Sequence, residues 1–176
     1  MSRLRLVLPS LADKERVMDY REEFIRNNER MDGCATLREA NTFEEWYQVF
    51  QDTLKEETVR PGFVPATTYL AVDGDEKLIG MIDIRHRLNE YLLNYGGHIG
   101  YSVRKSERRQ GYATEMLGLA LEKCVELGIK EVLVTCNKEN VASAKTILSN
   151  GGRLEDERSE EEVCIQRYWI HLGEIK

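Results

Sequence analysis

One segment constrains this chain more than any other. Between residues 98 and 127, a short apolar run, a basic loop with a glycine and an amphipathic helix follow one another. The run His98–Val103 is β-prone, and the basic loop ends at Gly111. The apolar positions that follow at helical spacing are Ala113, Leu117, Ala120, Cys124 and Leu127. The sequence therefore predicts a strand, a loop and a helix N-terminus in direct succession.

The loop Lys105–Thr114 has the properties of a phosphate-binding site. A helix N-terminus offers unpaired N–H groups and the positive end of the helix dipole, which bind phosphate oxygens. Gly111 lets the backbone approach a ligand because it has no Cβ, and Arg108 and Arg109 add cationic donors. The chain contains neither G-x-x-x-x-G-K-[ST] nor G-x-G-x-x-G. The alternative is an ordinary basic loop with a glycine at a helix start.

The remaining elements predict a mixed α/β domain of the α+β type. Further strands are expected at 4–8, 68–72, 78–84, 131–135 and 163–170. Further helices are expected at 13–28, 42–54 and 140–150, and the residues 85–97 form a polar loop. In the second helix Thr42 and Glu45 form a capping box. Its aromatic stripe, Phe43, Trp46, Tyr47 and Phe50, is interpreted as core-facing, with the wall of a binding cleft as the alternative.

Composition limits the function classes. A chain of 176 residues with 41% hydrophobic residues is expected to form one domain over residues 1–176. The net charge of −6 argues against bulk nucleic-acid binding. No leader or membrane-spanning stretch is evident, so we expect a cytoplasmic protein with no membrane partner. The four cysteines form no C-x-x-C pair, so no metal site is expected.

The residues Arg108, Gly111 and Ala113 spell R-x-x-G-x-A, which resembles the [QR]-x-x-G-x-[GA] signature of the GNAT superfamily of acetyl-CoA-dependent N-acetyltransferases. The strand before it, the Val132–Val134 run and the Asn140-x-x-Ser143 pattern are similar to the same family. The spelling of residues 111–115 looks most like the branch that acetylates the N-termini of ribosomal proteins. The resemblance implies a mostly antiparallel twisted sheet of about six to seven strands flanked by about four helices.

The resemblance also implies a coenzyme site. The pantetheine arm would lie along β-strand backbone, the pyrophosphate would lie on the loop, and Asn140 would hold the pantetheine. The implied acetyl-CoA-binding residues are Tyr101, Ser102, Val103, Arg108, Arg109, Gln110, Gly111, Tyr112, Ala113, Thr114, Asn140 and Ser143. Two positions depart from the family pattern. Ile147 stands where many members have a tyrosine acid, and Gly152 stands where a phenylalanine usually follows the glycine.

The expected reaction is direct attack of a primary amine on the thioester in a ternary complex, which needs no covalent enzyme intermediate. Ser143 is the candidate acid for the leaving thiolate, and its alternative is a small residue in a helix that Asn140 caps. His98 is the candidate base, with a water chain as the alternative. A backbone N–H between Ile99 and Tyr101 would stabilise the oxyanion.

The acceptor is expected to be a small-molecule amine. Arg85 and His86, in the loop after the second hairpin strand, are the candidate substrate-binding residues, and a solvated hairpin is the alternative. Residues 155–162 hold six acids in eight positions, which predicts a solvated hairpin tip. A peptide or protein N-terminus as acceptor, a non-catalytic acyl-CoA-binding module and a homodimer remain open alternatives.

Overall fold

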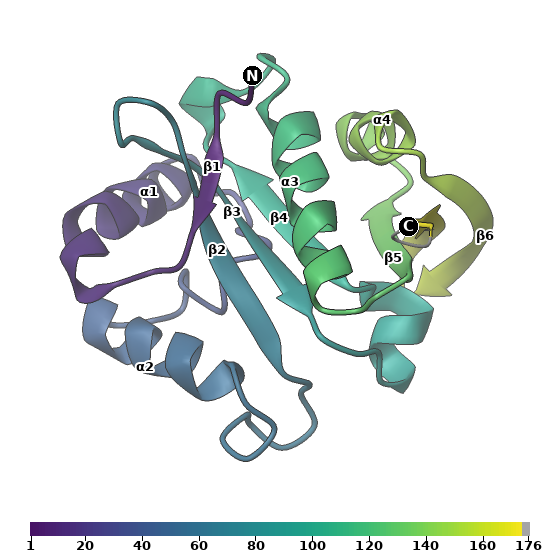
Figure 1. The fold of residues 1–176 in the computed structure, drawn as a ribbon, viewed down its shortest axis with the longest axis horizontal. Coiled ribbons are helices and arrows are strands. Elements are labelled where there is room, and N and C mark those ends of the chain that lie inside the picture. The colour runs from purple at the N-terminus through teal and green to yellow at the C-terminus, as the bar shows by residue number, and fades with distance from the viewer. Residues whose placement is uncertain (174–176) are drawn as a thin grey trace.

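The computed structural model describes residues 1–173 and contains two antiparallel sheets. The first sheet has the order β1-β2-β3-β4 and the second β5-β7-β6 (Figure 1). The strands are β1 Arg5–Val7, β2 Ala66–Val72, β3 Leu78–Arg85, β4 Ile99–Val103, β5 Glu131–Asn137, β6 Arg153–Glu160 and β7 Val163–His171. The helices are α1 Lys14–Arg26, α2 Phe43–Thr53, α3 Tyr112–Glu126 and α4 Val141–Ser149. The predicted α/β class is confirmed, although the strands divide into two sheets.

Two hydrophobic cores lie on opposite faces of the first sheet. Helices α1 and α2 cover one face, and α3 covers the other (Figure 1). The aromatic stripe of α2 faces the core between the sheet and helices α1 and α2, which contains Phe43 and Trp46. Phe50 is buried as well. Trp46 Nε1 also donates to the carbonyl of Cys34 at 2.7 Å. This burial confirms the core-facing interpretation of the stripe. Each such buried side chain stabilises the fold by roughly 1.5–3 kcal/mol.

Local signals fix the ends of the helices. The Thr42 hydroxyl accepts a hydrogen bond from the N–H of Glu45, which caps α2 as the sequence predicts. Gly128 adopts a φ of 76° just after α3, and the N–H of Ile129 donates to the carbonyl of Cys124. Both caps satisfy terminal backbone groups; the first fixes where α2 begins, and the second ends α3 before β5.

Three expectations need correction. The segment 85–97 is not irregular throughout, because Leu92–Gly96 forms a π-helical turn. Residues 155–162 are not a hairpin tip, because β6 extends to Glu160 and pairs with β7, leaving only two residues at the turn. Leu127 does not face the core and is exposed. The density of charges in residues 155–162 is typical of a loop, which is why a hairpin tip was predicted. However, β6 is an edge strand, and edge strands tolerate charged side chains well.

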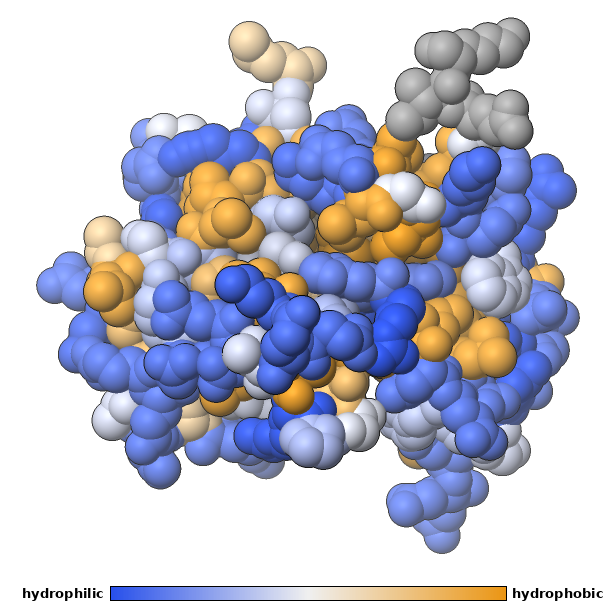
Figure 2. All heavy atoms as spheres, turned by 60° about the horizontal axis from the view of Figure 1, so that its bottom comes forward, coloured by the Kyte–Doolittle hydropathy of each residue, from blue (hydrophilic) through white to orange (hydrophobic). Residues whose placement is uncertain are grey.

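Exposed apolar side chains are scattered over the surface. Figure 2 shows one face on which hydrophilic side chains surround separate hydrophobic patches. Exposed apolar side chains such as Leu11 and Phe63 lie in different segments of the chain. Within residues 1–173, no helix combines the length and the hydropathy needed to cross a membrane.

Candidate active site

The strands β4 and β5 meet at one point and then diverge. The N–H of His98 donates to the carbonyl of Leu133 at 2.7 Å, and the N–H of Leu133 donates to His98 Nδ1 at 3.0 Å. Two residues further on, Thr135 Oγ1 donates to the carbonyl of Tyr95 instead of contacting β4. The two sheets are therefore joined at His98 and open beyond it, towards the N-termini of α3 and α4.

The opening is a cavity of about 1150 Å³ that runs between β4 and β5. At the two ends of the β3–β4 pairing, Arg85 N–H donates to the carbonyl of His98 and Arg104 N–H to the carbonyl of Ile79. Because bonding alternates along an antiparallel strand, the backbone groups of residues 99, 101 and 103 point away from β3 and into the cavity. Apart from the carbonyl of Val103, which accepts from Arg108 Nε, this strand edge has no partner among residues 1–173, so an extended ligand can join it.

The loop before α3 presents a second set of unpaired backbone groups. Arg109 has a φ of 62° and Gly111 a φ of 81°. Among residues 1–173, no atom accepts a hydrogen bond from the N–H groups of residues 109–114. Successive free N–H groups at a helix start form a concavity that attracts anions. The predicted phosphate loop therefore has its donors free and facing the cavity.

The side chains of this loop divide into two groups. Arg108 lines the cavity and is held in place: its Nε donates to the carbonyl of Val103 at 2.9 Å and its Nη1 pairs with Glu29 at 2.6 Å. Gln110 does not line the cavity, and its side chain donates to Glu107. Every other predicted coenzyme residue lines the cavity: Tyr101, Ser102, Val103, Arg109, Gly111, Tyr112, Ala113, Thr114, Asn140 and Ser143.

The chain's first residues are tied to the same helix. Glu115, in the first turn of α3, accepts hydrogen bonds from the hydroxyl of Ser2 and from the backbone N–H groups of Arg3 and Leu4. The guanidinium of Arg3 lies 4.4 Å from the centre of the Tyr112 ring. Burial opposes ionisation of Glu115, but the hydrogen bonds from these three residues lower its pKa overall. No motif in the sequence pointed to this contact, because its partners are more than a hundred residues apart.

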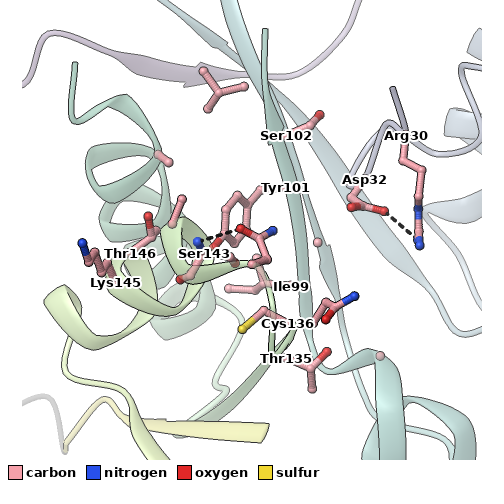
Figure 3. Close-up of a pocket in the computed structure, with 18 of the residues that line it drawn as sticks. Arg30, Asp32, Ile99, Tyr101, Ser102, Thr135, Cys136, Ser143, Lys145 and Thr146 are labelled. Atoms are coloured by element: carbon pink, nitrogen blue, oxygen red, sulfur yellow. Dashed lines mark hydrogen bonds and ion pairs between the residues drawn. The ribbon is translucent and has the colours of Figure 1, made fainter. Parts of the chain in front are cut away.

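The start of α4 brings three polar groups to the cavity. Asn140 Oδ1 accepts from the N–H of Ser143 at 3.1 Å and so caps the helix. The Ser143 hydroxyl lies 2.6 Å from the hydroxyl of Tyr101 on β4. Burial raises the pKa of Tyr101 to about 12. Figure 3 shows Tyr101 with its ring turned towards α4, beside Ser143.

Both predicted histidines lie outside the cavity lining. His98 is buried, and its Nδ1 already accepts from Leu133 N–H. Burial, with a contribution from Arg85, lowers the pKa of His98 to about 4. His86 Nε2 is bonded to the Thr67 hydroxyl at 2.8 Å, and burial lowers its pKa. The structure gives both rings a structural contact, and that of His98 joins the two sheets.

Arg85 lines the cavity, and two of its three guanidinium nitrogens contact neighbouring protein groups. Its Nη1 donates to the carbonyls of Gly96 and Gly97, and its Nε lies 3.2 Å from Asp83 Oδ2. Asp83 is buried beneath β4, where burial raises its pKa and the neighbouring Arg85 opposes the rise. Arg85 thus supports the turn at residues 96–97, and a role in binding an acceptor anion stays a prediction.

The end of the cavity beyond β4 is built by residues that the sequence did not single out. The segment 30–34 crosses β4 so closely that a Cβ on Gly33 would lie 2.2 Å from the carbonyl oxygen of Gly100. Next to it, Asp32 pairs with Arg30 at 3.3 Å (Figure 3). Glu160 at the end of β6 and Tyr91 before the π-helical turn complete this end. The neighbouring carboxylate of Glu160 raises the pKa of Tyr91.

A family model described as an acetyltransferase (GNAT) domain matches residues 3–153. The chain belongs to the GNAT acetyltransferase family. It is therefore an acyltransferase, as the sequence predicts. No curated protein sequence matches the chain significantly.

Solved structures share the fold of this GNAT acetyltransferase at low identity. A ribosomal L7/L12 α-N-protein acetyltransferase, RimL, in complex with coenzyme A is 17% identical, with a TM-score of 0.71, over 97% of this chain and 95% of that chain. A spermidine N-acetyltransferase from Vibrio cholerae, in complex with CoA and spermine, is 14% identical, with a TM-score of 0.67, over 96% and 95%. The microcin C7 self-immunity acetyltransferase MccE, in complex with acetyl-CoA and AMP, is 17% identical, with a TM-score of 0.68, over 97% and 93%.

The two departures from the GNAT pattern have a common structural reason. Ile147 is fully buried in the core between the sheets and α3. A Cβ on Gly152 would lie 2.5 Å from the Ile147 side chain, so the chain after α4 packs directly on this residue. A tyrosine at position 147 would displace that packing. In this GNAT acetyltransferase the nearest phenol to the start of α4 comes from β4 instead.

Proposed function

We propose that this acetyltransferase moves the acetyl group of acetyl-CoA to a small-molecule primary amine by direct attack in a ternary complex. The observation that carries the proposal is the row of free N–H groups at residues 109–114 beside an unpaired strand edge. An anion and an extended chain are the two ligands these features suit, and the pyrophosphate and pantetheine of one coenzyme supply both.

The coenzyme would lie along β4. Its amide groups would pair with the backbone of Tyr101 and Val103, and its pyrophosphate would accept hydrogen bonds from residues 109–114. The thioester would then lie near Tyr101, where the cavity passes from α4 to the acceptor end. The N–H of Tyr101, which points into the cavity, is our candidate for stabilising the oxyanion.

The chemical steps need few groups. The amine loses its proton before attack, since an ammonium has no free electron pair. We assign that proton to water at the acceptor end, where Asp32 and Glu160 line the cavity, because the Nδ1 of His98 is already occupied. The leaving thiolate takes a proton from Ser143, whose hydroxyl faces the cavity from the first turn of α4.

We favour a small acceptor because the segment 30–34 packs directly on Gly100 and bounds the acceptor end of the cavity on that side. Asp32, Tyr91 and Glu160 also line this end and offer polar groups to an amine. A peptide N-terminus and a non-catalytic coenzyme-binding module are the competing functions.

The test is release of free thiol from acetyl-CoA in the presence of diamines, amino acids and short peptides, together with calorimetric titration of coenzyme A. We expect coenzyme A to bind and at least one small amine to increase thiol release. Release with peptides alone would favour an N-terminal acetyltransferase. Binding without release would favour a non-catalytic module, and absence of binding would overturn the whole proposal.

The variant Arg108→Glu sharpens the test. It breaks the contacts to Val103 and Glu29 and places a negative charge beside the phosphates, so we expect coenzyme A affinity to fall by at least about 10-fold. Arg5→Glu is the matched control, because Arg5 lies on β1, away from the cavity, and pairs with Glu76. Equal affinities of the two variants would contradict the placement of the pyrophosphate.

A further inference from the structure

We propose that Tyr101 is a positioning residue for departure of the coenzyme: its hydroxyl donates to Ser143 Oγ and restores the proton that Ser143 gives to the thiolate. This inference rests on the proposed acetyl transfer. The resemblance to the family implies only coenzyme contacts along the strand backbone for Tyr101, so a role for its hydroxyl goes beyond it.

The contact itself is short and fixed on both sides. The two hydroxyl oxygens are 2.6 Å apart, at the short end of the normal O–H···O range. Ser143 is held in the first turn of α4 by the bond from its N–H to Asn140. Tyr101 is held by its strand and by burial of its ring against the core. Both residues line the cavity.

The other tyrosines that line the cavity have different neighbours. The rings of Tyr91 and Tyr95 pack on each other with their centres 5.7 Å apart, and Tyr112 lies under the guanidinium of Arg3 at the coenzyme loop. Helix α4 contains no tyrosine, and Ile147, at the position of the family's tyrosine acid, faces the core. Tyr101 is therefore the phenol that meets Ser143.

The direction of the hydrogen bond follows from acidity. Burial raises the pKa of Tyr101 from its ordinary value near 10 to about 12, but an aliphatic hydroxyl is a weaker acid still, so the tyrosine is the better donor of the pair. When Tyr101 donates to Ser143 Oγ, the proton of Ser143 is free to point at a sulfur in the cavity. A serine alone would become an alkoxide on giving up that proton, which is costly near pH 7.

The proton balance closes without an outside reagent. The amine nitrogen attacks the thioester carbonyl, and collapse of the tetrahedral intermediate breaks the C–S bond and leaves the electron pair on sulfur. Sulfur takes the proton of Ser143 Oγ, and the phenol proton moves to the same oxygen. The phenolate of Tyr101 regains through water the proton that the amine has lost.

The test compares Tyr101→Phe with Ser143→Ala, using the amine that gives the highest thiol release. We expect each variant to lower kcat by roughly 100-fold, the lower end of what a positioned proton donor contributes. The KM for acetyl-CoA should stay unchanged, because the strand backbone is kept. The double variant should be no slower than either single variant, since both act in one step. Thermal unfolding of each variant verifies that the fold is kept.

Tyr69→Phe is the matched control, because Tyr69 lies on β2 outside the cavity. A fluorinated tyrosine at position 101 adds a readout that a purely structural role would not change. Its lower phenol pKa should cause kcat to fall at alkaline pH, where the unmodified enzyme keeps its rate because the pKa of Tyr101 is about 12.

The outcomes separate the two proposals. An active protein in which Tyr101→Phe has full kcat, or in which the fluorinated tyrosine leaves the pH profile unchanged, contradicts the relay alone. Additive losses in the double variant also contradict it. A native protein that releases no thiol with any amine contradicts the proposed function, and the relay with it.

Discussion

The two ends of the cavity are built on different principles. The coenzyme end consists of one continuous segment, from β4 through the loop to α3, and its ligand groups are backbone N–H and C=O. The acceptor end is assembled from four separate segments, around Asp32, Arg85, Tyr91 and Glu160, and its groups are side chains. At the coenzyme end the donors are free, whereas at the acceptor end most charges are paired with one another.

If the coenzyme binds as proposed, this difference lets the fold keep its coenzyme while the acceptor varies. Backbone groups would bind the coenzyme whatever the side chains are, provided that the loop keeps its conformation. The acceptor end depends on side chains from loops, so its chemistry changes when a few residues change. Substitutions at the two ends should therefore separate cleanly into effects on coenzyme affinity and effects on acceptor use.

The largest effect is expected from Gly33→Ala at the acceptor end. The new Cβ would lie 2.2 Å from the Gly100 carbonyl oxygen, at a φ of 69° that alanine rarely adopts. We expect the free energy of unfolding to fall by roughly 3 kcal/mol, because overlap with backbone adds to the conformational cost. The KM for the amine should rise, while coenzyme A affinity is kept. Chemical denaturation and steady-state kinetics measure both.

Gly62→Ala is the control for that comparison. Gly62 has a similar φ of 85°, but a Cβ there would meet nothing within 4 Å. We expect a loss of only about 1 kcal/mol from backbone conformation, with no change in kinetics. If Gly33→Ala also lowered the affinity for coenzyme A, the prediction that substitutions at the two ends have separate effects would be wrong.

A smaller effect is expected from Gly111→Ala at the coenzyme end. The left-handed conformation of residue 111 costs an alanine about 1–2 kcal/mol, so the loop should shift and coenzyme A affinity should fall by roughly 10-fold. Gly128→Ala places the same strain at the other end of α3, where a Cβ meets no neighbour. Calorimetry should show weaker binding for the first variant alone, and equal binding would contradict the backbone origin of the site.

The contrast between one continuous segment and an end assembled from distant segments also explains which features the sequence could predict. The strand, the glycine loop and the capped helices depend on neighbouring residues, so periodicity and caps located them. Gly33 gave no signal, because its importance arises from contact with Gly100, which is distant along the chain. The resemblance to the GNAT pattern pointed to Ser143, but its contact with Tyr101 gave no signal, since it depends on how far β4 and α4 stand apart.

His98 shows the limit of assigning chemistry by residue type. A histidine beside the expected acceptor suggested a base, but the ring sits in the joint between the sheets, where Nδ1 must stay unprotonated to accept from Leu133. Its pKa in the folded protein is lowered to about 4, below the value near 6.5 of an unfolded chain. The unfolded state therefore binds a proton at a higher pH than the folded state.

The smallest predicted effect follows from that difference. The contribution of His98 to stability is complete above pH 6.5 and declines as the pH falls towards 4, by about 1 kcal/mol between pH 7 and pH 5.5. His98→Asn keeps an acceptor near the place of Nδ1 but does not titrate, so its unfolding free energy should lose this part of the pH dependence. Denaturation at several pH values measures the slope. If the slope stayed the same while kcat lost its rise with pH, His98 would belong to the reaction after all, and the joint would not be its main role.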